Sequence, residues 1–304
     1  MPRLRDNLKP GARIDRYRVV EDIGKGGFSL VYLAEDEETG DEVLVKEFMP
    51  KRLARRDDSG RLVPLDETRL ENLHRGRRMF FQEAQAMASL RHPHIVAVLN
   101  VFLANNTAYI VMQYERGRNL GQLIRQRGNL SMTLTLRILL PLLDALALMH
   151  SRSMLHLDLK PSNIHLRTGH DPLLLDLGAV HLMDNNSRAG SQVITPGYSP
   201  PEQYKRDGNI GPWTDVYAIG ASLRCCLDGQ PPQPAHERVV KDSLEPAVNA
   251  LRGRYPAWLP QLIDRCMDLD SQRRPQDAGQ VLDILRQHQE ARAFPTRTLF
   301  APKP

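Results

Sequence analysis

The chain has 304 residues, with 41 basic and 36 acidic side chains and a formal net charge of +5. Hydrophobic residues make up 41% and charged residues 25%, which is ordinary for a globular protein and excludes a disordered or collagen-like chain. Three cysteines are too few for a disulfide framework, so a reducing compartment, the cytoplasm, is expected. The N-terminus lacks the apolar core of a secretory signal, and the longest apolar run, residues 138–149, is too short to span a bilayer.

The first part of the chain has the pattern of β-strands. One helix interrupts them: good helix formers predict it over residues 78–90, and Pro93 ends it. β-rich runs bounded by turn residues indicate strands at residues 17–23, 29–35, 42–48, 96–103 and 108–114.

From Asn119 onward the spacing of apolar residues becomes helical. Helices are predicted over residues 131–151, 213–227, 258–269 and 276–288. Strands followed by helices indicate an α+β protein with a small β-lobe and a larger helical lobe. The last stretch, residues 291–304, has no periodicity and is interpreted as a tail or linker.

A glycine cluster, Gly24, Gly26 and Gly27, lies between the first two predicted strands. Such a turn would let backbone N–H groups approach phosphate oxygens, although a glycine-rich hairpin is more often only a hairpin. A dinucleotide-binding fingerprint needs a helix after the glycines, whereas residues 29–35 are strand-like, and the sequence contains no GxxxxGK[ST] phosphate loop. The cluster alone therefore does not decide between a nucleotide site and a plain turn.

Lys46 lies among apolar residues on the third predicted strand, and Glu83 lies on the helix that follows. A strand lysine often extends its charged end to the surface, and an exposed ion pair contributes little to stability. If the pair is buried, Glu83 would instead fix the lysine where it can hold α- and β-phosphates.

The most informative segment is HLDLKPSN, residues 156–163, followed by DLG at residues 176–178. Asp158 could accept the proton of an attacking hydroxyl, and Lys160 could neutralise charge on a transferring phosphoryl group. Asn163 and Asp176 carry the hard oxygen atoms that Mg²⁺ prefers. These residue types at this spacing are not typical of an ordinary solvated turn.

Taken in order, the glycine cluster, Lys46, Glu83, HLDLKPSN, DLG and SPPE at residues 199–202 resemble the protein-kinase signature. The resemblance runs from about residue 17 to residue 288. The segments TPGYSPPEQY and GPWTDVY look most like the eukaryotic-like Ser/Thr protein kinases of bacteria.

This resemblance implies a bilobal kinase fold with the nucleotide between the lobes. Residues 17–115 would form the N-lobe, a small antiparallel sheet with one helix, and residues 116–290 the larger helical C-lobe. Residues 1–16 would be a basic N-terminal arm, and residues 291–304 the tail or linker.

The resemblance also assigns the nucleotide-binding residues. Lys46, held by Glu83, would bind the α- and β-phosphates, and Met112 falls at the gatekeeper position. The glycine loop and the hinge would supply the remaining contacts, from Gly24, Lys25, Gly26, Gly27, Phe28, Ser29, Val31, Gln113, Tyr114 and Glu115.

The implied catalytic base is Asp158, with Lys160 and Thr195 completing the Ser/Thr-type catalytic cluster. Asn163 and Asp176 would ligate Mg²⁺, so ATP and Mg²⁺ are the implied cofactors. Supporting roles fall to Glu202 with Arg274, to Asp215 beneath the catalytic-loop backbone, and to Met87, His156 and Leu177 in an apolar stack.

Four residues depart from the family pattern. Leu157 replaces the arginine that precedes the catalytic Asp, so a phosphate on the activation segment would have one cationic partner fewer. We therefore expect basal activity without a phosphate on Ser187 or Ser191. The other departures are milder. This chain has Ser29 where the family has the third loop glycine, Leu44 where it has the alanine of the lysine strand, and Leu177 where it has the Phe of DFG.

Glu83 follows Lys46 by 37 positions, roughly twenty more than a compact kinase needs. The extra segment, about residues 51–78, is interpreted first as a solvated loop, with a small hairpin near residues 58–60. A docking or regulatory element is the alternative, because the segment leads into the helix that carries Glu83. It holds nine basic and five acidic residues, so this segment and the two basic termini are where an acidic partner or an anionic membrane would bind. No nucleic-acid partner is expected.

The sequence thus predicts an ATP- and Mg²⁺-dependent protein serine/threonine kinase that phosphorylates proteins, including itself. In-line transfer of the γ-phosphoryl group would depend mainly on positioning and charge stabilisation. The alternatives are a pseudokinase scaffold that binds protein partners and, less favoured because of Lys160 and the TPGYSPPE segment, a small-molecule phosphotransferase.

Overall fold

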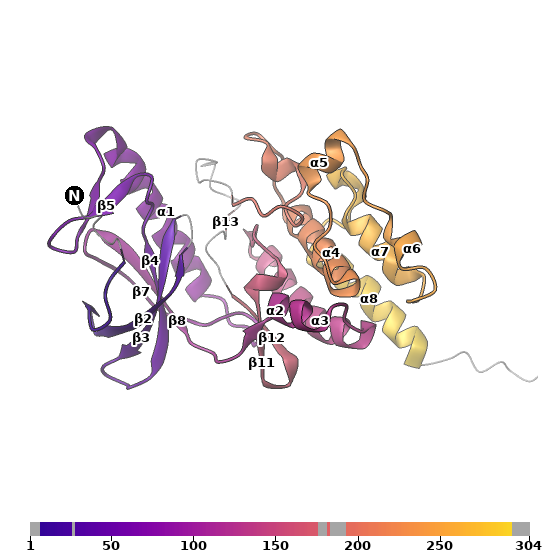
Figure 1. The fold of residues 1–304 in the computed structure, drawn as a ribbon, viewed down its shortest axis with the longest axis horizontal. Helices are drawn as coiled ribbons and strands as arrows, with labels where there is room; N and C mark the ends of the chain where they lie inside the picture. The colour runs from indigo at the N-terminus through magenta and orange to yellow at the C-terminus, as the bar shows by residue number, and fades with distance from the viewer. Residues whose placement is uncertain (1–6, 26–27, 176–180, 183–192, 294–304) are drawn as a thin grey trace, which may run out of the picture. The chain divides into compact units, whose positions relative to one another are not determined.

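The structure is a computed structural model that describes residues 7–25, 28–175, 181–182 and 193–293 (Figure 1). The chain divides into two compact units. Unit 1 comprises Met1–Arg118, His165–Gly169 and Leu173–Ser191, and unit 2 comprises Asn119–Ile164, His170–Pro172 and Gln192–Pro304. The main division falls after Arg118, three residues beyond the lobe boundary that the sequence predicts between residues 115 and 116.

Unit 1 contains a six-stranded antiparallel sheet with the strand order β1-β2-β3-β4-β8-β7. Its strands are β1 (Arg13–Ile14), β2 (Tyr17–Lys25), β3 (Ser29–Asp36), β4 (Glu42–Phe48), β7 (Val98–Ala104) and β8 (Thr107–Gln113). Strand β1 was not predicted. It lies within the segment interpreted as a basic arm, and it forms because Ile14 is completely buried and pairs with Tyr17.

The two faces of this sheet have different partners, because successive strand side chains point to opposite faces. On β4, Lys46 faces a cavity beside helix α1 (Leu70–Ala88), and its neighbour Glu47 points the other way. The Glu47 face carries an apolar core with polar groups embedded in it. The core includes Ile14, Tyr17, Tyr32, Val45, Ala54, Leu62, Leu73, Tyr109 and Val111.

The segment at residues 51–78 is largely ordered structure, so its interpretation as a solvated loop is wrong. Strands β5 (Ala54–Arg56) and β6 (Leu62–Pro64) pair as the suggested hairpin, and a 3₁₀ turn, η1 (Glu67–Arg69), follows. Ala54 and Leu62 are each 2% exposed because they pack in the core of unit 1.

Helix α1 begins eight residues before the predicted start at residue 78. The sequence does not indicate this earlier start, because Gly76 would lie inside the helix and glycine disfavours a helix interior. Its place is explained by Phe48, because a Cβ at Gly76 would lie 2.8 Å from the ring of Phe48. The helix therefore continues through a glycine that permits close packing on β4.

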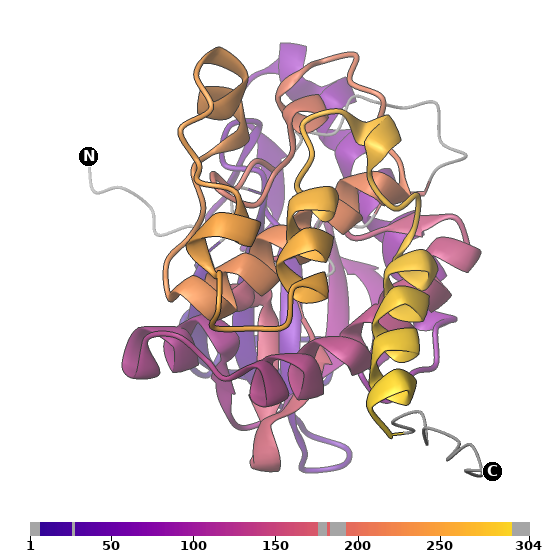
Figure 2. The ribbon, with the colours of Figure 1, turned by 90° about the vertical axis from the view of Figure 1, so that its right-hand side faces the viewer.

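Unit 2 is mainly helical, and its helices lie toward the viewer in Figure 2. Helix α8 packs against α3 and α4, and α7 packs against α4. A Cβ at Gly220 of α4 would lie 2.6 Å from the Cβ of Cys266, so glycine permits the close approach of α4 and α7. The helices are α2 (Leu120–Arg127), α3 (Met132–Ser151), α4 (Pro212–Asp228), α5 (Ala235–Val240), α6 (Ala247–Ala250), α7 (Trp258–Cys266) and α8 (Ala278–Ala293).

Helix α3 is, within the described residues, long and apolar enough to cross a membrane by length and composition. Ten of its side chains, among them Ile138, Leu142 and Leu146, are buried in unit 2. The same composition is expected of a core helix, because such a helix is apolar around most of its circumference.

Short elements connect these helices and carry much of the candidate site. They are β9 (Arg118–Asn119), β10 (Met154–Leu155), η2 (Pro161–Asn163), β11 (Ile164–Arg167), η3 (Thr168–His170), β12 (Asp171–Leu174), β13 (His181–Leu182), η5 (Pro201–Tyr204) and η6 (Ser271–Arg273).

Candidate active site

Lys46 lies in the middle of the unit 1 sheet and is 5% exposed. Its backbone pairs with Val31 on β3 and with Ile110 on β8, so two neighbouring strands fix its position. The possibility that this lysine extends to the surface is therefore wrong. Its ammonium group lies in an enclosed region where it interacts electrostatically with Glu83.

A small cavity opens beside this lysine, and charged and apolar side chains share its wall. Burial raises the pKa of Glu83 to about 7, and the nearby Lys46 ammonium partly opposes that rise. The lining residues are Lys46, Phe80, Glu83, Ala84, Met87, Val98, Ile110 and Met112. Lys46, Glu83 and Met112, which the sequence predicts to act together, are therefore neighbours in unit 1.

Five of the remaining predicted nucleotide contacts, Gly24, Lys25, Ser29, Val31 and Gln113, lie on β2, β3 and the end of β8. Gly24 opposes Val31 across the hairpin, and Lys25 pairs with Leu30. Phe28 accepts a backbone hydrogen bond from Met49 through its carbonyl, and Ser29 is 9% exposed.

The predicted hinge follows β8. Gln113 is exposed, and its amide donates to the Glu115 carboxylate at 2.9 Å. Tyr114 is half-buried. Gly26 and Gly27 of the loop lie outside the described residues.

The predicted catalytic cluster lies in unit 2 and is formed by side chains from two segments. Lys160 Nζ is 2.9 and 2.8 Å from the two carboxylate oxygens of Asp158. Thr195 Oγ1 donates to Asp158 Oδ1 at 2.6 Å and accepts from Lys160 Nζ at 3.0 Å. Asp158 is 8% exposed, so these contacts are largely shielded from water. The three predicted catalytic residues thus meet in one hydrogen-bonded cluster.

Asn163, at the end of η2, completes the cluster. Its amide nitrogen donates to Asp158 Oδ2 at 3.0 Å and to the Asp158 carbonyl at 2.8 Å. Because Nδ2 is used in this way, Oδ1 is the atom available to a cation, which fits the hard oxygen ligand that Mg²⁺ requires. The other predicted Mg²⁺ ligand, Asp176, and Leu177 beside it lie outside the described residues.

No group of three or more His, Cys, Asp and Glu side chains suited to a metal ion is found among residues 7–25, 28–175, 181–182 and 193–293. Those ranges omit Asp176, so they contain one predicted ligand of the pair, Asn163.

Asp215 of α4 accepts hydrogen bonds from the backbone just before Asp158. The N–H groups of His156 and Leu157 each donate to its carboxylate at 2.8 Å, and His150 Nε2 lies 3.0 Å away. Burial opposes the charged form, but these hydrogen bonds prevail and lower the pKa of Asp215. The predicted support of the catalytic loop by Asp215 is therefore present.

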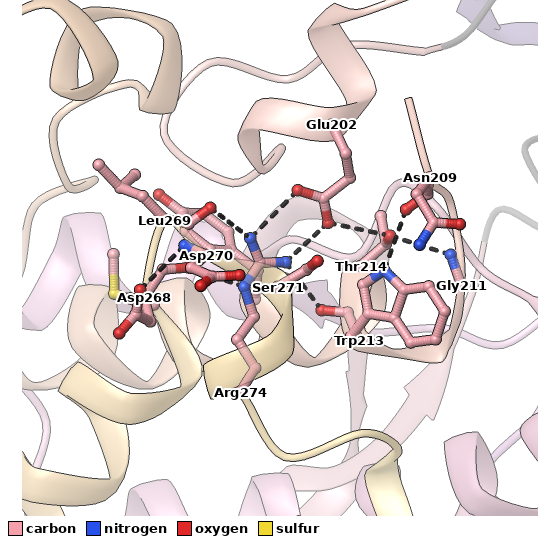
Figure 3. A network of polar contacts seen from close by, with 12 residues as sticks. Glu202, Asn209, Gly211, Trp213, Thr214, Asp268, Leu269, Asp270, Ser271 and Arg274 are labelled. Carbon is pink, nitrogen blue, oxygen red and sulfur yellow. Dashed lines mark hydrogen bonds and ion pairs between the residues drawn. The ribbon is translucent and has the colours of Figure 1, made fainter. Parts of the chain in front are cut away.

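A second predicted support, Glu202 with Arg274, lies at the centre of the network in Figure 3. The two side chains form a bidentate pair with N–O distances of 2.7 and 3.1 Å, and both are buried. Thr214 Oγ1 donates to Glu202, and Arg274 also donates to the carbonyl oxygens of Asp268 and Trp213 (Figure 3).

Two polar contacts near these groups were not predicted. Glu47, next to Lys46, forms a buried ion pair with Arg56 of the β5–β6 hairpin. Gln203, next to Glu202, donates to the Leu157 carbonyl beside Asp158. For the Glu47–Arg56 pair, the turn residues at positions 58–60 predicted the hairpin, but they did not show which of its arginines is buried. The kinase resemblance gave no role to Gln203.

Comparison with known proteins agrees with this geometry. The protein kinase domain family matches residues 17–287. The serine/threonine-protein kinase PknK of Mycobacterium tuberculosis is 33% identical over 276 residues, which cover 88% of this chain and 23% of PknK. A probable serine/threonine-protein kinase PknB of Lactococcus lactis is 28% identical over 88% of this chain and 41% of that protein.

A solved structure agrees as well. PpkA-294 in its apo form matches with a TM-score of 0.78 and 32% identity, over 92% of this chain and all of that one. The chain spans between about a quarter and two fifths of the length of the two curated relatives described above. The predicted α+β kinase fold is confirmed, and the chain belongs to the protein kinase domain family, with bacterial Ser/Thr kinases among its relatives.

Proposed function

We propose that this chain is an ATP- and Mg²⁺-dependent protein serine/threonine kinase that phosphorylates protein hydroxyls, including its own. The observation that carries the proposal is the Asp158–Lys160–Thr195 cluster with Asn163 against it. It combines a base, a cation and an oxygen ligand within hydrogen-bond distance of one another, which is the set that phosphoryl transfer to a hydroxyl requires.

Each group in the cluster has a part in this reaction. Asp158 accepts the proton of the attacking Ser or Thr hydroxyl, and Thr195 and Asn163 hold its carboxylate in position. Lys160 neutralises charge on the phosphoryl group during transfer. Because Lys160 contacts both Asp158 and Thr195, it also orders the cluster before a substrate binds.

The nucleotide-binding part of the proposal rests on unit 1. Lys46 would hold the α- and β-phosphates, and Val31, Met112 and the backbone of residues 113–115 would contact the adenine. ATP would supply the phosphoryl group, and Mg²⁺ held by Asn163 and Asp176 would neutralise its charge. The buried Lys46 fits this role, because a lysine fixed on a central strand, with Glu83 close enough to interact electrostatically, presents a positive charge at a fixed place.

Two further predictions stay proposals. A reducing compartment, the cytoplasm, is proposed because Cys225, Cys226 and Cys266 are all free thiols. An acidic partner is proposed for the basic segment at residues 51–78, whose exposed cations include Lys51, Arg52, Arg55 and Arg61.

The function is tested by incubating the purified chain with γ-³²P-labelled ATP, Mg²⁺ and a generic protein acceptor, followed by phosphoamino-acid analysis. Label on serine or threonine is expected, and it should be lost when Mg²⁺ is removed with a chelator. A nucleotide-induced rise in the unfolding temperature without any transfer of label would instead identify a pseudokinase scaffold.

A further inference from the structure

Gln203 connects the anchored part of unit 2 to the backbone beside the catalytic Asp. It lies on η5, one position after Glu202, whose carboxylate is fixed by Arg274 and Thr214. Successive residues of a 3₁₀ helix point in directions about 120° apart, so anchoring Glu202 also sets the direction of its neighbour. Gln203 is 3% exposed, and its amide is directed at backbone oxygens.

The first oxygen is the carbonyl of Leu157, which receives a hydrogen bond from Gln203 Nε2 at 2.8 Å. Leu157 has a φ of 58°, a left-handed conformation that costs a branched residue about 1–2 kcal/mol. Its N–H is held by Asp215, as described above, and its carbonyl is held by Gln203. Both backbone groups of this strained residue are thus held by side chains from outside the catalytic loop.

The second oxygen is the carbonyl of Val193, 3.4 Å from the same nitrogen. Both neighbours of the amide group are acceptors, so its NH₂ end must face them. Val193 precedes by two residues Thr195, which contacts Asp158 and Lys160. One side-chain amide therefore joins the catalytic loop to the segment that delivers Thr195.

This link matters because of the residue at position 157. The resemblance places an arginine there in related kinases, where its cation can hold a phosphorylated activation segment. Leu157 has no charged group, yet the loop backbone and the segment before Thr195 are still joined, through the neutral amide of Gln203.

We propose that Gln203 is a positioning residue that fixes Asp158 and Thr195 relative to each other without a phosphate on the activation segment. The proposal rests on the proposed kinase function. It predicts a defect in the transfer step and none in nucleotide binding, because the predicted phosphate-binding lysine, Lys46, belongs to unit 1. A misplacement of about 1 Å at reacting groups can reduce a rate about 100-fold.

The test compares Gln203→Leu, which keeps the side-chain size but removes the donor, with Gln203→Glu, which keeps the shape and replaces the donor by an acceptor. The matched control is Gln261→Leu, since Gln261 is exposed on α7. Initial rates at varied ATP give kcat and KM for the full chain. We expect kcat to fall 10- to 100-fold in both Gln203 variants, with KM for ATP within about twofold of the parent and the control unchanged.

A pH series gives a readout that a packing defect would not produce. A protonated carboxyl can donate to the Leu157 carbonyl, so the activity of Gln203→Glu relative to the parent should rise as pH falls from 8 to 6, while Gln203→Leu should stay low. If Gln203→Leu fails to fold, the Gln203→Glu series alone decides.

The outcomes separate the two proposals. If the parent transfers phosphate and both Gln203 variants keep kcat within twofold, the positioning role is wrong and the kinase function stands. A rise in KM for ATP equal to the fall in kcat/KM would also overturn it. If the parent itself transfers no phosphate, the proposed function fails instead. The expected loss should persist with Ser187 and Ser191 both changed to Ala, and its disappearance there would contradict independence from phosphate.

Discussion

Among the residues that the structure describes, each unit contains one buried Arg–Glu pair, and the two pairs are built differently. Arg274 and Glu202 in unit 2 form a bidentate pair, and the arginine also donates to the carbonyls of Asp268 and Trp213. In unit 1, Arg56 donates to Glu47 Oε2 at 2.6 Å and to the Gly60 carbonyl at 2.9 Å.

Two tyrosine hydroxyl groups also donate hydrogen bonds to Glu47. Tyr32 and Tyr109 donate to its two carboxylate oxygens at 2.9 and 3.0 Å. Burial and the charge of Glu47 together raise the pKa of both tyrosines, which keeps them protonated as donors.

The difference shows what each pair does. Arg274 binds several backbone carbonyls in addition to Glu202, so it holds the η5 turn and the start of α4 in one place. Arg56 joins the β5–β6 hairpin to the strand that carries Lys46, within a core of tyrosines and aliphatic residues. Removing one partner of a buried pair leaves an uncompensated charge, which costs about 3–5 kcal/mol. Glu47 keeps two tyrosine donors when Arg56 is removed, so Arg274 should be the more costly arginine to lose.

The largest effect is expected for Arg274→Leu. We expect about 3–5 kcal/mol less free energy of unfolding, because Glu202 loses its counter-charge and two of its donors while several carbonyls also lose theirs. Urea unfolding followed by circular dichroism measures it. The adjacent Arg273→Leu is the control, since the Arg273 side chain is 73% exposed and should change the free energy by less than about 1 kcal/mol. Equal effects of the two substitutions would contradict the account.

A smaller loss, about 2–3 kcal/mol, is expected for Arg56→Met, since both tyrosines still donate to Glu47. Adding Glu47→Gln should recover part of the loss, because a neutral amide needs no counter-charge. Arg55→Met, at an exposed neighbouring position, serves as the control in the same unfolding titration. If Arg56→Met behaves like Arg55→Met, the hairpin is not anchored by this pair.

The smallest effect concerns Glu83, a carboxylate beside a lysine rather than an arginine. Because its pKa is raised to about 7 in the folded chain, the folded state binds more protons than the unfolded state between about pH 4.5 and pH 7. Its contribution is therefore present at low pH and is lost as pH rises through 7. Glu83→Gln should make stability between pH 5 and 8 flatter by about 1–2 kcal/mol.

The control for this pH series is Glu71→Gln, an exposed position on the same helix. An unchanged pH dependence in Glu83→Gln, measured as the midpoint of thermal unfolding from pH 5 to pH 8, would show that Glu83 titrates in its ordinary range.

Of the two buried Arg–Glu pairs described above, the sequence predicts one and gives no sign of the other. Glu202 and Arg274 belong to a recurrent motif, so their pairing follows from the family resemblance. Arg56 is one of nine basic residues in a segment of mixed charge, and nothing in the sequence marks it as the one that turns inward. Its burial depends on Tyr32 and Tyr109, which lie 24 positions before it and 53 after it.

The same contrast explains which other features of the molecule could be predicted from the sequence and which could not. Asp158, Lys160 and Asn163 could be predicted because their residue types and spacing suit the chemistry, whereas Thr195 followed from the family resemblance. The start of α1 could not, because Gly76 is explained by contact with Phe48 rather than by helix propensity. Gln203 was missed for a similar reason, since its partners are backbone oxygens, which leave no trace in residue identity.

The most direct test of the central claim is a rapid-quench, single-turnover measurement of phosphoryl transfer by the parent chain and by Asp158→Asn. The amide keeps the shape of the carboxylate but cannot accept the hydroxyl proton. We predict at least a 100-fold slower transfer step, about 2.7 kcal/mol of barrier, with nucleotide affinity unchanged. A transfer rate within a few-fold of the parent would contradict the assignment of Asp158 as the base on which the proposed function rests.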